Sequence, residues 1–390
     1  MPAVERQLVE CVRHVIKGSE PTRVGVVSSQ EDQNNALIEQ FGPGATATTC
    51  KDITSLEKLS DLNVLVVNQA LEKELHDSQA LDKFISGALR SLRVDGVLIV
   101  RQDLCSPKLA GLYLDSHKEA FPKTSEWNCF IPVLDFLDRT QYTDTGIFAY
   151  EWIFGDNFIS PGGWDQNLAI LKRFGPMKTG QTMLDIGVGI GGGARQAASE
   201  FGLHVLGVDL STNMLAVALD RVHKEKDARV TYAVCDAVEY DFDPNSFDYV
   251  FSRDCIQHIK DTEKLFSRIF RALKPGGKVL ITMYGVGHGK LSEQFKEYVS
   301  QRQYYLKNLE QIEEIAKKVG FIDIETENMT PRFKEILLEE RQRVEQNKEE
   351  FLEKFSQKEY DSLVKGWSSK LQYIADDNHN WNFFAAIKPH

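Results

Sequence analysis

Short apolar runs alternate with longer amphipathic stretches through the first part of the chain. The runs are rich in Val, Ile and Leu and have the length of buried strands, and the stretches between them have the apolar spacing of helices. This alternation is typical of a parallel sheet with crossover helices. The predicted strands are Arg23–Ser28, Asn63–Asn68, Gly96–Arg101 and Phe130–Phe136, and the predicted helices are Glu31–Phe41 and Leu81–Leu92.

The second part of the chain repeats this alternation more completely. A charged helical run, Phe333–Phe355, comes late, and its mixture of Glu, Lys and Arg favours a face exposed to solvent. Because the order of elements is similar in both parts, we expect two copies of one α/β fold. The predicted strands are Met183–Ile186, Val205–Asp209, Val230–Val234, Asp248–Ser252, Val279–Tyr284, Ile322–Glu325 and Trp381–Ile387, and the predicted helices are Ala194–Phe201, Asn213–His223 and Thr262–Leu273.

A change in composition separates the two parts. The segment Asp138–Gly162 is rich in aromatic residues, Gly and Asp, unlike the Val-, Ile- and Leu-rich runs on either side. At roughly 150 residues per domain, a chain of 390 residues favours more than one domain. We therefore expect one domain over residues 1–139 and another over residues 140–390.

Composition and charge exclude several classes of protein. With 46 Lys and Arg against 57 Asp and Glu, the formal charge is -11, which argues against nucleic acid and anionic lipid surfaces as partners. No apolar run approaches the roughly 18 residues that span a bilayer, and the first residues lack the pattern of a signal peptide. The six cysteines are scattered without a CxxC pair, which indicates a reducing compartment and no structural zinc. We expect a soluble cytoplasmic protein with a small-molecule substrate and no metal, and the sequence leaves its oligomeric state open.

A glycine-rich segment carries the strongest local signal. Residues Leu184–Gly193 read LDIGVGIGGG and connect a predicted strand to a predicted helix. Glycines there allow a ligand to approach the backbone, and a helix start offers free N–H donors. A tight turn between strand and helix needs glycine in any case, so this segment alone does not decide between a binding site and a turn.

Three acidic residues lie at the ends of successive predicted strands. Asp185 precedes the glycines, where it would repel a pyrophosphate, which argues against a dinucleotide. Asp209 ends the next strand, where a carboxylate can hold ribose hydroxyls, and Asp236 follows the third strand beside Ala237. Each acid alone is also a common helix cap. Together they favour a cationic nucleoside without phosphate, and S-adenosylmethionine is such a ligand.

Several motifs in the same order resemble those of the class I S-adenosylmethionine-dependent methyltransferases. They are the glycine segment, GVDLS at Gly207–Ser211, CDA at Cys235–Ala237, FDYVFSRDCIQHI at Phe247–Ile259 and LKPGGKVLIT at Leu273–Thr282. The resemblance implies a Rossmann-like α/β domain with a seven-stranded, mostly parallel sheet and helices on both faces.

Five further stretches look like those of the phosphobase methyltransferases, also called phosphoethanolamine methyltransferases. This family methylates phosphoethanolamine and its monomethyl and dimethyl forms to phosphocholine. The resemblance runs from about residue 141 to the C-terminus. The stretches are Gln141–Gly163, Ser252–His258, Ile281–Tyr284, Glu297–Tyr304 and Gly366–Lys370.

The resemblance implies residues for each part of the site. An amine must lose its proton before it attacks a methyl group, and the family's Tyr–His pair matches Tyr142 and His258, with Asp254 placed to hold the amine. Which member of the pair takes the proton stays open. The residues that match substrate contacts are Gln141, Tyr142, Tyr284, Arg302, Tyr304 and Lys370. Those that match the cofactor site are Tyr150, Ile159, Ser160, Asp185, Gly187, Gly189, Asp209, Leu210, Asp236, Ala237 and Asp254.

Arg302 and Tyr304 are only two positions apart in a predicted helix. Residues two apart on an ideal helix do not share a face. If both contact one phosphate, the segment must be distorted or loop-like there.

The first domain lacks a glycine loop. Its first strand leads into the polar stretch Ser29–Asp32, so we interpret this domain as a degenerate methyltransferase domain without a cofactor site. A degenerate first domain and an active second one resemble nematode-type members of the family, which convert phosphomonomethylethanolamine and phosphodimethylethanolamine to phosphocholine. The alternatives are methylation of all three phosphobases, methylation of another small molecule such as a sterol or thiol, and a binding or scaffold module without enzymatic activity.

Overall fold

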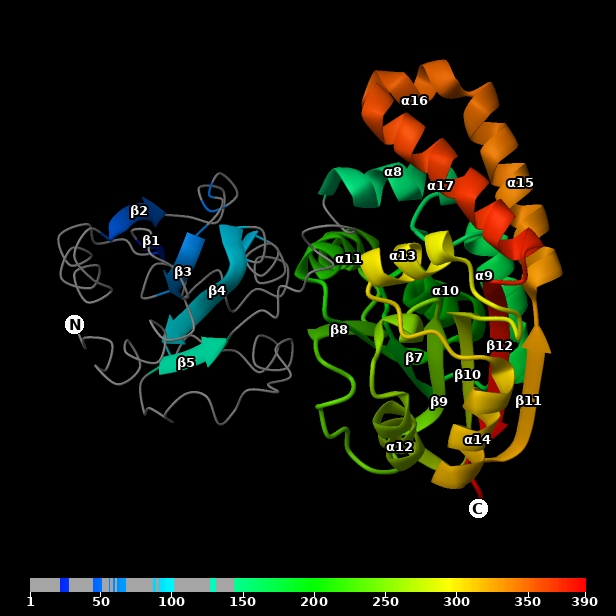
Figure 1. Ribbon diagram of the computed structural model, residues 1–390. Coiled ribbons are helices and arrows are strands. Elements are labelled where there is room, and N and C mark those ends of the chain that lie inside the picture. The colour runs from blue at the N-terminus through cyan, green and yellow to red at the C-terminus, as the bar shows by residue number, and fades with distance from the viewer. Residues whose placement is uncertain are drawn as a thin grey trace. The chain divides into compact units, whose positions relative to one another are not determined.

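The part of the chain that the structure describes contains two β-sheets (Figure 1). The structure, a computed structural model, describes residues 144–390 and, before them, residues 22–27, 45–50, 56, 59, 62–67, 87–88, 91–101 and 127–130. The chain passes for the first time from one compact unit to the other between Thr143 and Asp144. The domain limits at 139 and 140 stay a prediction. Within the described ranges, no helix is long and apolar enough to cross a membrane.

The first sheet has the strand order β2-β1-β3-β4-β5. The first four strands are parallel, and β5 is antiparallel to β4. Val26 of β1 and Leu65 of β3 are fully buried, as expected of parallel strands covered on both faces. The strands are β1 Arg23–Val27, β2 Thr46–Cys50, β3 Leu62–Val67, β4 Leu92–Arg101 and β5 Trp127–Phe130.

Some predicted elements of this part need correction. β4 begins at Leu92, so the last residue of the helix predicted over 81–92 is the first of a strand. The strand predicted over 130–136 meets β5 only at Phe130, and its other residues lie outside the described ones. The helix predicted over 31–41 also lies outside them. The apolar pattern does not predict β2, because its sequence, TATTC, contains no apolar run.

The second sheet has seven strands in the order β11-β12-β10-β9-β6-β7-β8. β12 is antiparallel to β10 and to β11, and the pairs of β6 with β7, β6 with β9 and β9 with β10 are parallel. All seven predicted strands of this part are confirmed. They are β6 Thr182–Ile186, β7 His204–Asp209, β8 Val230–Val234, β9 Phe247–Arg253, β10 Leu273–Gly285, β11 Ile322–Asn328 and β12 Asn380–Ile387.

Both sheets contain the same arrangement of five strands. The order β2-β1-β3-β4-β5 of the first corresponds to β7-β6-β9-β10-β12 of the second, and in each the last strand is the antiparallel one. A parallel sheet with one reversed strand at the same place is a specific arrangement. It supports the prediction that the two halves share one fold.

Helices cover the second sheet and extend beyond its strand ends. α12 and α14 pack together against strands β10 to β12, and α9 and α10 form another pair. α15 contacts α8, α16 and α17, and this group lies past the end toward which β11 points (Figure 1). The helices are α8 Asp144–Phe154, α9 Gly163–Leu171, η3 Lys172–Phe174, α10 Gly192–Phe201, α11 Thr212–Glu225, η4 Ile256–His258, α12 Thr262–Ala272, α13 Glu293–Gln301, α14 Leu309–Val319, α15 Thr330–Gln346, α16 Lys348–Lys354 and α17 Gln357–Ala375.

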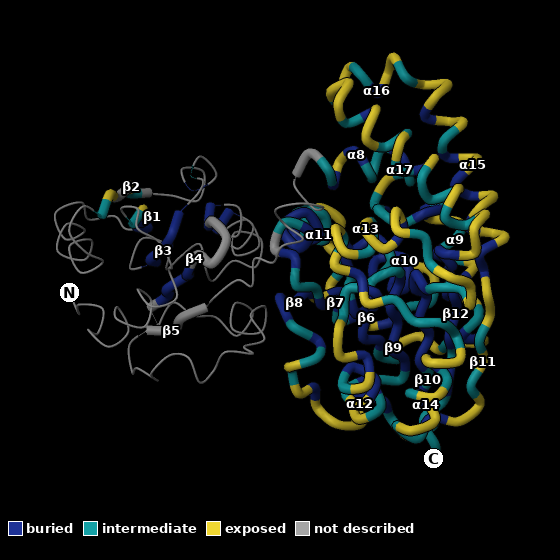
Figure 2. The backbone as a smooth tube through the Cα atoms, viewed as in Figure 1, coloured by how far each residue is buried: buried dark blue, intermediate teal, exposed yellow. Residues whose placement is uncertain are grey.

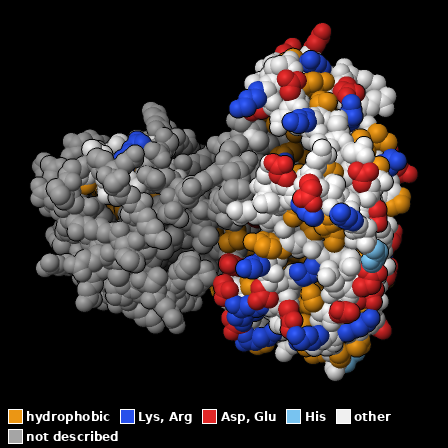
Figure 3. Space-filling view, in the orientation of Figure 1, with side chains coloured by type: hydrophobic (Ala, Val, Ile, Leu, Met, Phe, Trp, Pro, Cys, Tyr) orange, Lys and Arg blue, Asp and Glu red, His pale blue; other side chains and the backbone are white. Residues whose placement is uncertain are grey.

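The core of this half lies between the central strands and the helices. Leu184, Val250, Leu280 and Phe383, one from each of four neighbouring strands, are fully buried (Figure 2). On the face shown in Figure 3, Lys and Arg side chains are mixed with Asp and Glu. This mixture fits a solvated surface better than a surface for a polyanion.

The charged run predicted as a solvated face forms α15 and α16. The prediction is correct for its outer side, where Arg332 and Glu335 form an exposed ion pair. It is wrong for Glu340, which is only 6% exposed and lies on the buried side of α15 with Ile336 and Val344. A buried carboxylate is costly unless it is paired, so Glu340 needs a physical explanation.

Candidate active site

The carboxylate of Asp254 lies at the end of β9. Its backbone has a positive φ of 52°, and its N–H donates to the Thr282 carbonyl at 2.9 Å. Oδ1 accepts from the Thr282 hydroxyl at 2.9 Å and from Trp381 Nε1 at 2.7 Å. Oδ2 is buried without a hydrogen-bond partner, and Arg253 Nε lies 3.9 Å from it. One oxygen is therefore fixed by the sheet, and the other can receive a cationic ligand.

His258 lies four residues further on, at the end of η4. Its ring meets the Tyr304 ring edge-on, with 4.9 Å between centroids. Burial, and then the charge of Arg302, lowers the pKa of His258 to about 4. The imidazole is therefore neutral at pH 7 and able to accept a proton.

The end of α13 and the turn that follows it bring Arg302 and Tyr304 together. α13 ends at Gln301, Arg302 is its C-cap, and Gln303 has a positive φ of 51°. The helix therefore stops before Tyr304, whose ring is buried 6.1 Å from that of Tyr284. The distortion that the sequence requires between these two residues is present.

A second cation, Lys370, comes from α17. Its Nζ lies 5.4 Å from the centroid of the Tyr284 ring. Burial, and then the charge of Arg302, lowers the pKa of Lys370 to about 8, while Glu340 and Asp254 oppose this shift. Arg302 and Lys370 are both half-buried, and an anion bound near both would reduce the repulsion between them.

The phenol oxygens around Arg302 stabilise its charge. Burial opposes the charge, but the neighbouring oxygens of Tyr150, Tyr304 and Tyr298 more than offset this, so the net pKa of Arg302 is raised. Tyr298 lies four residues before Arg302, with the guanidinium 5.8 Å from its ring centroid. Residues four apart are neighbours on a helix surface, so the spacing of Tyr298 and Arg302 already indicates that they lie close together. The motifs do not name Tyr298.

His379 is a buried histidine that no motif marks. It has no exposed surface and neither ring nitrogen has a hydrogen-bond partner. Its ring packs edge-on against Tyr284 at 4.8 Å and near Phe333 at 5.7 Å. Burial, and then Lys370, lowers its pKa to about 3. His379 therefore supports Tyr284 as a neutral aromatic group.

The glycine loop follows β6 as predicted. Gly187 has a positive φ of 76°, and a Cβ there would lie 2.3 Å from Cys255 Sγ. Gly187 and Val188 donate their N–H groups to the Val208 carbonyl. A Cβ on Gly189 would lie 3.2 Å from Ile159 Cδ1, so the Ile159 side chain lies against this glycine. Close packing on both sides requires glycine at these positions.

The three predicted acids lie at one edge of the sheet. β6, β7 and β8 are neighbours, Asp185 is buried in β6, and Asp209 ends β7 while Asp236 follows β8. Asp209 Oδ1 accepts from the Ser211 N–H at 2.8 Å, so one of its oxygens stabilises the turn into α11. The acids and the glycine loop fit a cationic nucleoside. Leu210 is half-buried and Ala237 buried beside them.

The remaining predicted residues divide into two groups. Tyr150 on α8 and Ser160 in the connection to α9 are described, and Tyr150 helps to stabilise the charge of Arg302. Gln141 and Tyr142 lie outside the described residues. Among the described residues, no group of three or more His, Cys, Asp or Glu side chains could hold a metal ion. The roles of all these residues stay predictions.

The fold and the glycine loop define a class I methyltransferase. A family model described as "Methyltransferase domain" matches residues 184–281, and one described as "Phosphoethanolamine N-methyltransferase 2 N-terminal" matches residues 2–110. Phosphoethanolamine N-methyltransferase 2 of Caenorhabditis elegans is 51% identical over 99% of this chain and 98% of its own. The chain belongs to the phosphoethanolamine N-methyltransferase family.

Solved structures of a second relative cover the whole chain. Phosphoethanolamine N-methyltransferase 2 of Haemonchus contortus is 69% identical, and its structure covers 100% of both chains with a TM-score of 0.68. That protein was solved in complex with phosphomonomethylethanolamine and S-adenosylhomocysteine, and separately with S-adenosyl-L-methionine.

Thr282→Val should lower kcat/KM for methyl transfer by about ten- to a hundredfold, because a hydrogen bond to a charged group contributes roughly 1.5–3 kcal/mol. Valine keeps the shape of threonine but leaves Asp254 Oδ1 with Trp381 as its remaining donor. Thr282→Ser keeps the hydroxyl and should retain most of the activity. Steady-state kinetics beside thermal melts would measure both, and a folded valine variant with wild-type kcat/KM would contradict the role of this bond.

In the free protein, His258 should titrate well below the ordinary histidine pKa of about 6.5, with a midpoint near the pKa of about 4 that burial and Arg302 impose. NMR of histidine labelled at Cε1 would follow it, with His258→Gln used to assign the signal. Arg302→Gln removes the neighbouring charge and should move the midpoint upward. A midpoint at 6 or above in the wild-type protein would show that the imidazole is not desolvated.

Proposed function

We propose that this protein transfers a methyl group from S-adenosylmethionine to the amine of phosphomonomethylethanolamine and phosphodimethylethanolamine, and so forms phosphocholine. One observation carries the proposal: a buried carboxylate oxygen of Asp254 without a hydrogen-bond partner shares a cluster with the cations Arg302 and Lys370. Such a cluster suits a small molecule with an ammonium at one end and a phosphate at the other. The ligands of the Haemonchus contortus relative support this choice.

The cofactor site fits S-adenosylmethionine by the chemistry of its residues. When bound, this molecule supplies an electrophilic methyl group. Asp209 and Asp236 present carboxylates at neighbouring strand ends, and the glycine loop connects β6 to α10. Asp185 would repel a pyrophosphate, which supports a nucleoside over a dinucleotide.

At the amine, residues of the chain must hold a cation and remove a proton. Asp254 Oδ2 would hold the ammonium, since Thr282 and Trp381 already fix its other oxygen. His258, neutral at pH 7, would accept the proton directly or through the Tyr142 hydroxyl. Proton removal exposes the nitrogen lone pair that attacks the methyl group.

At the phosphate, Arg302 and Lys370 would supply charge and Tyr284 and Tyr304 hydroxyls. Burial is the main cause of the low pKa of His258 and the charge of Arg302 the second, and the phosphate would neutralise part of that charge. Substrate binding would therefore raise the basicity of His258 when the base is needed. This links recognition of one end of the substrate to activation of the other.

For the first half we propose a methyltransferase fold without a cofactor site. The shared strand order supports common ancestry of the two sheets, and the polar stretch after β1 supports loss of the glycine loop. We further propose a cytoplasmic location from the six scattered cysteines, and a small molecule rather than a nucleic acid as partner from the net charge of -11.

Purified protein supplied with S-adenosylmethionine and each phosphobase separately should methylate phosphomonomethylethanolamine and phosphodimethylethanolamine but not phosphoethanolamine. Mass spectrometry of the products would distinguish the three reactions. Asp254→Asn, which keeps the size of the side chain but removes its charge, should lose turnover of both substrates and serves as the control for contaminating activity. Turnover of all three phosphobases would remove the proposed restriction, and turnover of none would remove the substrate class.

Phosphocholine should bind more weakly above pH 8, because the pKa of Lys370 is lowered to about 8 and the neutral amine no longer attracts phosphate. Affinity should fall about tenfold per pH unit between pH 8.5 and 9.5, as for any ligand that requires the protonated form of one group. Phosphocholine suits this calorimetric test because its quaternary ammonium does not titrate. Lys370→Arg, which stays charged, should remove the slope; the same slope in both proteins would assign it to another group.

A further inference from the structure

The connection between α8 and α9 is held at two separate places. At the first, Asn157 Oδ1 accepts from Arg195 at 2.5 Å and the Asn157 N–H donates to Glu151 at 2.6 Å. A Cβ on Gly192 would lie 1.9 Å from the Asn157 carbonyl oxygen, so this part of the connection lies directly on the start of α10. These contacts fix the connection just before Ile159.

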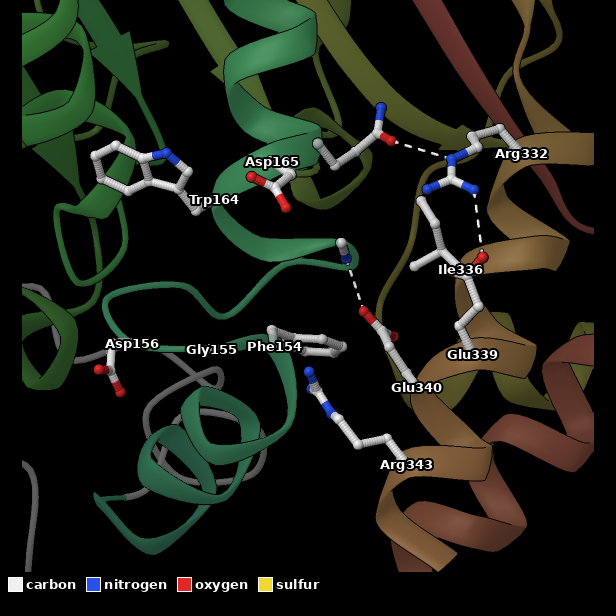
Figure 4. A pocket seen from close by; sticks show the side chains of 12 residues that line it. Phe154, Gly155, Asp156, Trp164, Asp165, Arg332, Ile336, Glu339, Glu340 and Arg343 are labelled. Atoms are coloured by element: carbon white, nitrogen blue, oxygen red, sulfur yellow. Dashed lines mark hydrogen bonds and ion pairs between the residues drawn. The ribbon is translucent and has the colours of Figure 1, made fainter. Parts of the chain in front are cut away.

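The second place is the three-residue segment Pro161–Gly163. Arg253 donates to the Pro161 carbonyl and, at 3.2 Å, to the Gly163 carbonyl. Between them, the Gly162 N–H donates to Glu340 Oε1 at 2.7 Å, the bond drawn in Figure 4. A buried arginine from β9 and a buried glutamate from α15 thus bind three successive backbone groups. We call Arg253 and Glu340 the loop clamp.

The charges around the clamp explain why Glu340 is tolerated inside the protein. Burial raises the pKa of Glu340 to about 7, and the Gly162 N–H and the cations Arg343, Lys370 and Arg253 oppose this shift. Glu340 Oε2 has no hydrogen-bond partner, so Oε1 and Gly162 provide its hydrogen bond. Arg253 also donates a hydrogen bond to Asn167 Oδ1 at 3.0 Å. Both residues are buried, so the pair does not serve solubility.

The backbone at Gly162 is shaped for this contact. Gly162 has a positive φ of 79°, and a Cβ there would lie 2.5 Å from Gln166 and 3.2 Å from Ile336. The glycine turns its N–H toward α15, where Glu340 and Ile336 stand one turn apart (Figure 4). No side chain larger than hydrogen fits without movement.

We infer that the loop clamp positions Ile159 and Ser160 over the cofactor, which makes Glu340 and Arg253 positioning residues for methyl transfer. Ile159 and Ser160 lie between the two anchored places, and Ile159 lies against Gly189 of the glycine loop. Arg253 also precedes Asp254, and its Nε forms an ion pair at 3.9 Å with Asp254 Oδ2. The clamp therefore connects the segment over the cofactor to the carboxylate that would hold the amine. This inference rests on the proposed function for the identity of the cofactor.

The test compares Glu340→Ala and Arg253→Lys with Glu339→Ala. Glu339 is the neighbour of Glu340 on α15, but it is exposed and pairs with Arg332 instead of the connection. Hydrogen exchange of the peptide over residues 157–163, followed by mass spectrometry without ligand, reports the clamp directly. Exchange should accelerate about tenfold in both clamp variants, as expected for loss of a hydrogen bond to a charged group, and stay unchanged in the control.

Calorimetry with S-adenosylhomocysteine then reports the consequence for the cofactor. Its Kd should rise about tenfold in each clamp variant. In the double variant the fold-increase in Kd should be smaller than the product of the two single fold-increases, because both residues act on one segment. Kd for phosphocholine should change less than Kd for S-adenosylhomocysteine.

Two results would overturn the inference. If the peptide over residues 157–163 exchanges at the wild-type rate in both clamp variants, the segment is held by other contacts. Faster exchange with an unchanged Kd for S-adenosylhomocysteine would show that the clamp does not position the cofactor segment. Arg253→Lys keeps the internal charge and gives the same test if Glu340→Ala does not fold. Failure of the wild-type protein to bind S-adenosylhomocysteine would instead overturn the proposed function, independently of the exchange result.

Discussion

The buried carboxylate of Asp254 is the constraint on which the rest of the site depends. A charge in a protein interior is tolerated only when neighbouring groups stabilise it. Thr282 from β10 and Trp381 from β12 donate to one oxygen, and Arg253 lies beside the other. Three neighbouring strands therefore have to be in register before this carboxylate can be buried. The reversed strand β12 contributes chemistry as well as packing, because it supplies the indole.

The charges of the site form one coupled set. Burial, and then the charge of Arg302, lowers the pKa of His258 and of Lys370, while Glu340 and Asp254 stabilise the charge of Lys370. In the absence of a ligand, this arrangement leaves cations close together and a base that is too weak at neutral pH. An anion between the cations would relieve both conditions at once.

The sequence determined the second sheet well and the first one less completely. The predicted strands match all seven strands of the second sheet. For the parallel strands the reason is that burial on both faces requires mostly apolar residues. This reason does not apply to β11, an antiparallel and mostly exposed strand with the sequence IDIETEN. β2 escaped prediction because Thr46–Cys50 has no apolar run, and β4 starts four residues earlier than its apolar core. For α15, composition indicated a solvated helix, and only the packing of its inner side shows that Glu340 is buried.

In the site, the sequence by itself determined which groups are present at strand ends, since the glycine loop and the acids occupy fixed places in the strand order. Motif matching named His258, Arg302 and Lys370, but the effect of the Arg302 charge on the pKa of His258 and of Lys370, which adds to that of burial, depends on the distances between η4, α13 and α17. The tertiary structure alone decided that helix α13 stops before Tyr304, that His379 packs behind Tyr284, and that Glu340 and Arg253 bind one loop. These contacts join residues far apart in the chain, and the local sequence does not indicate which distant residues a buried side chain will contact.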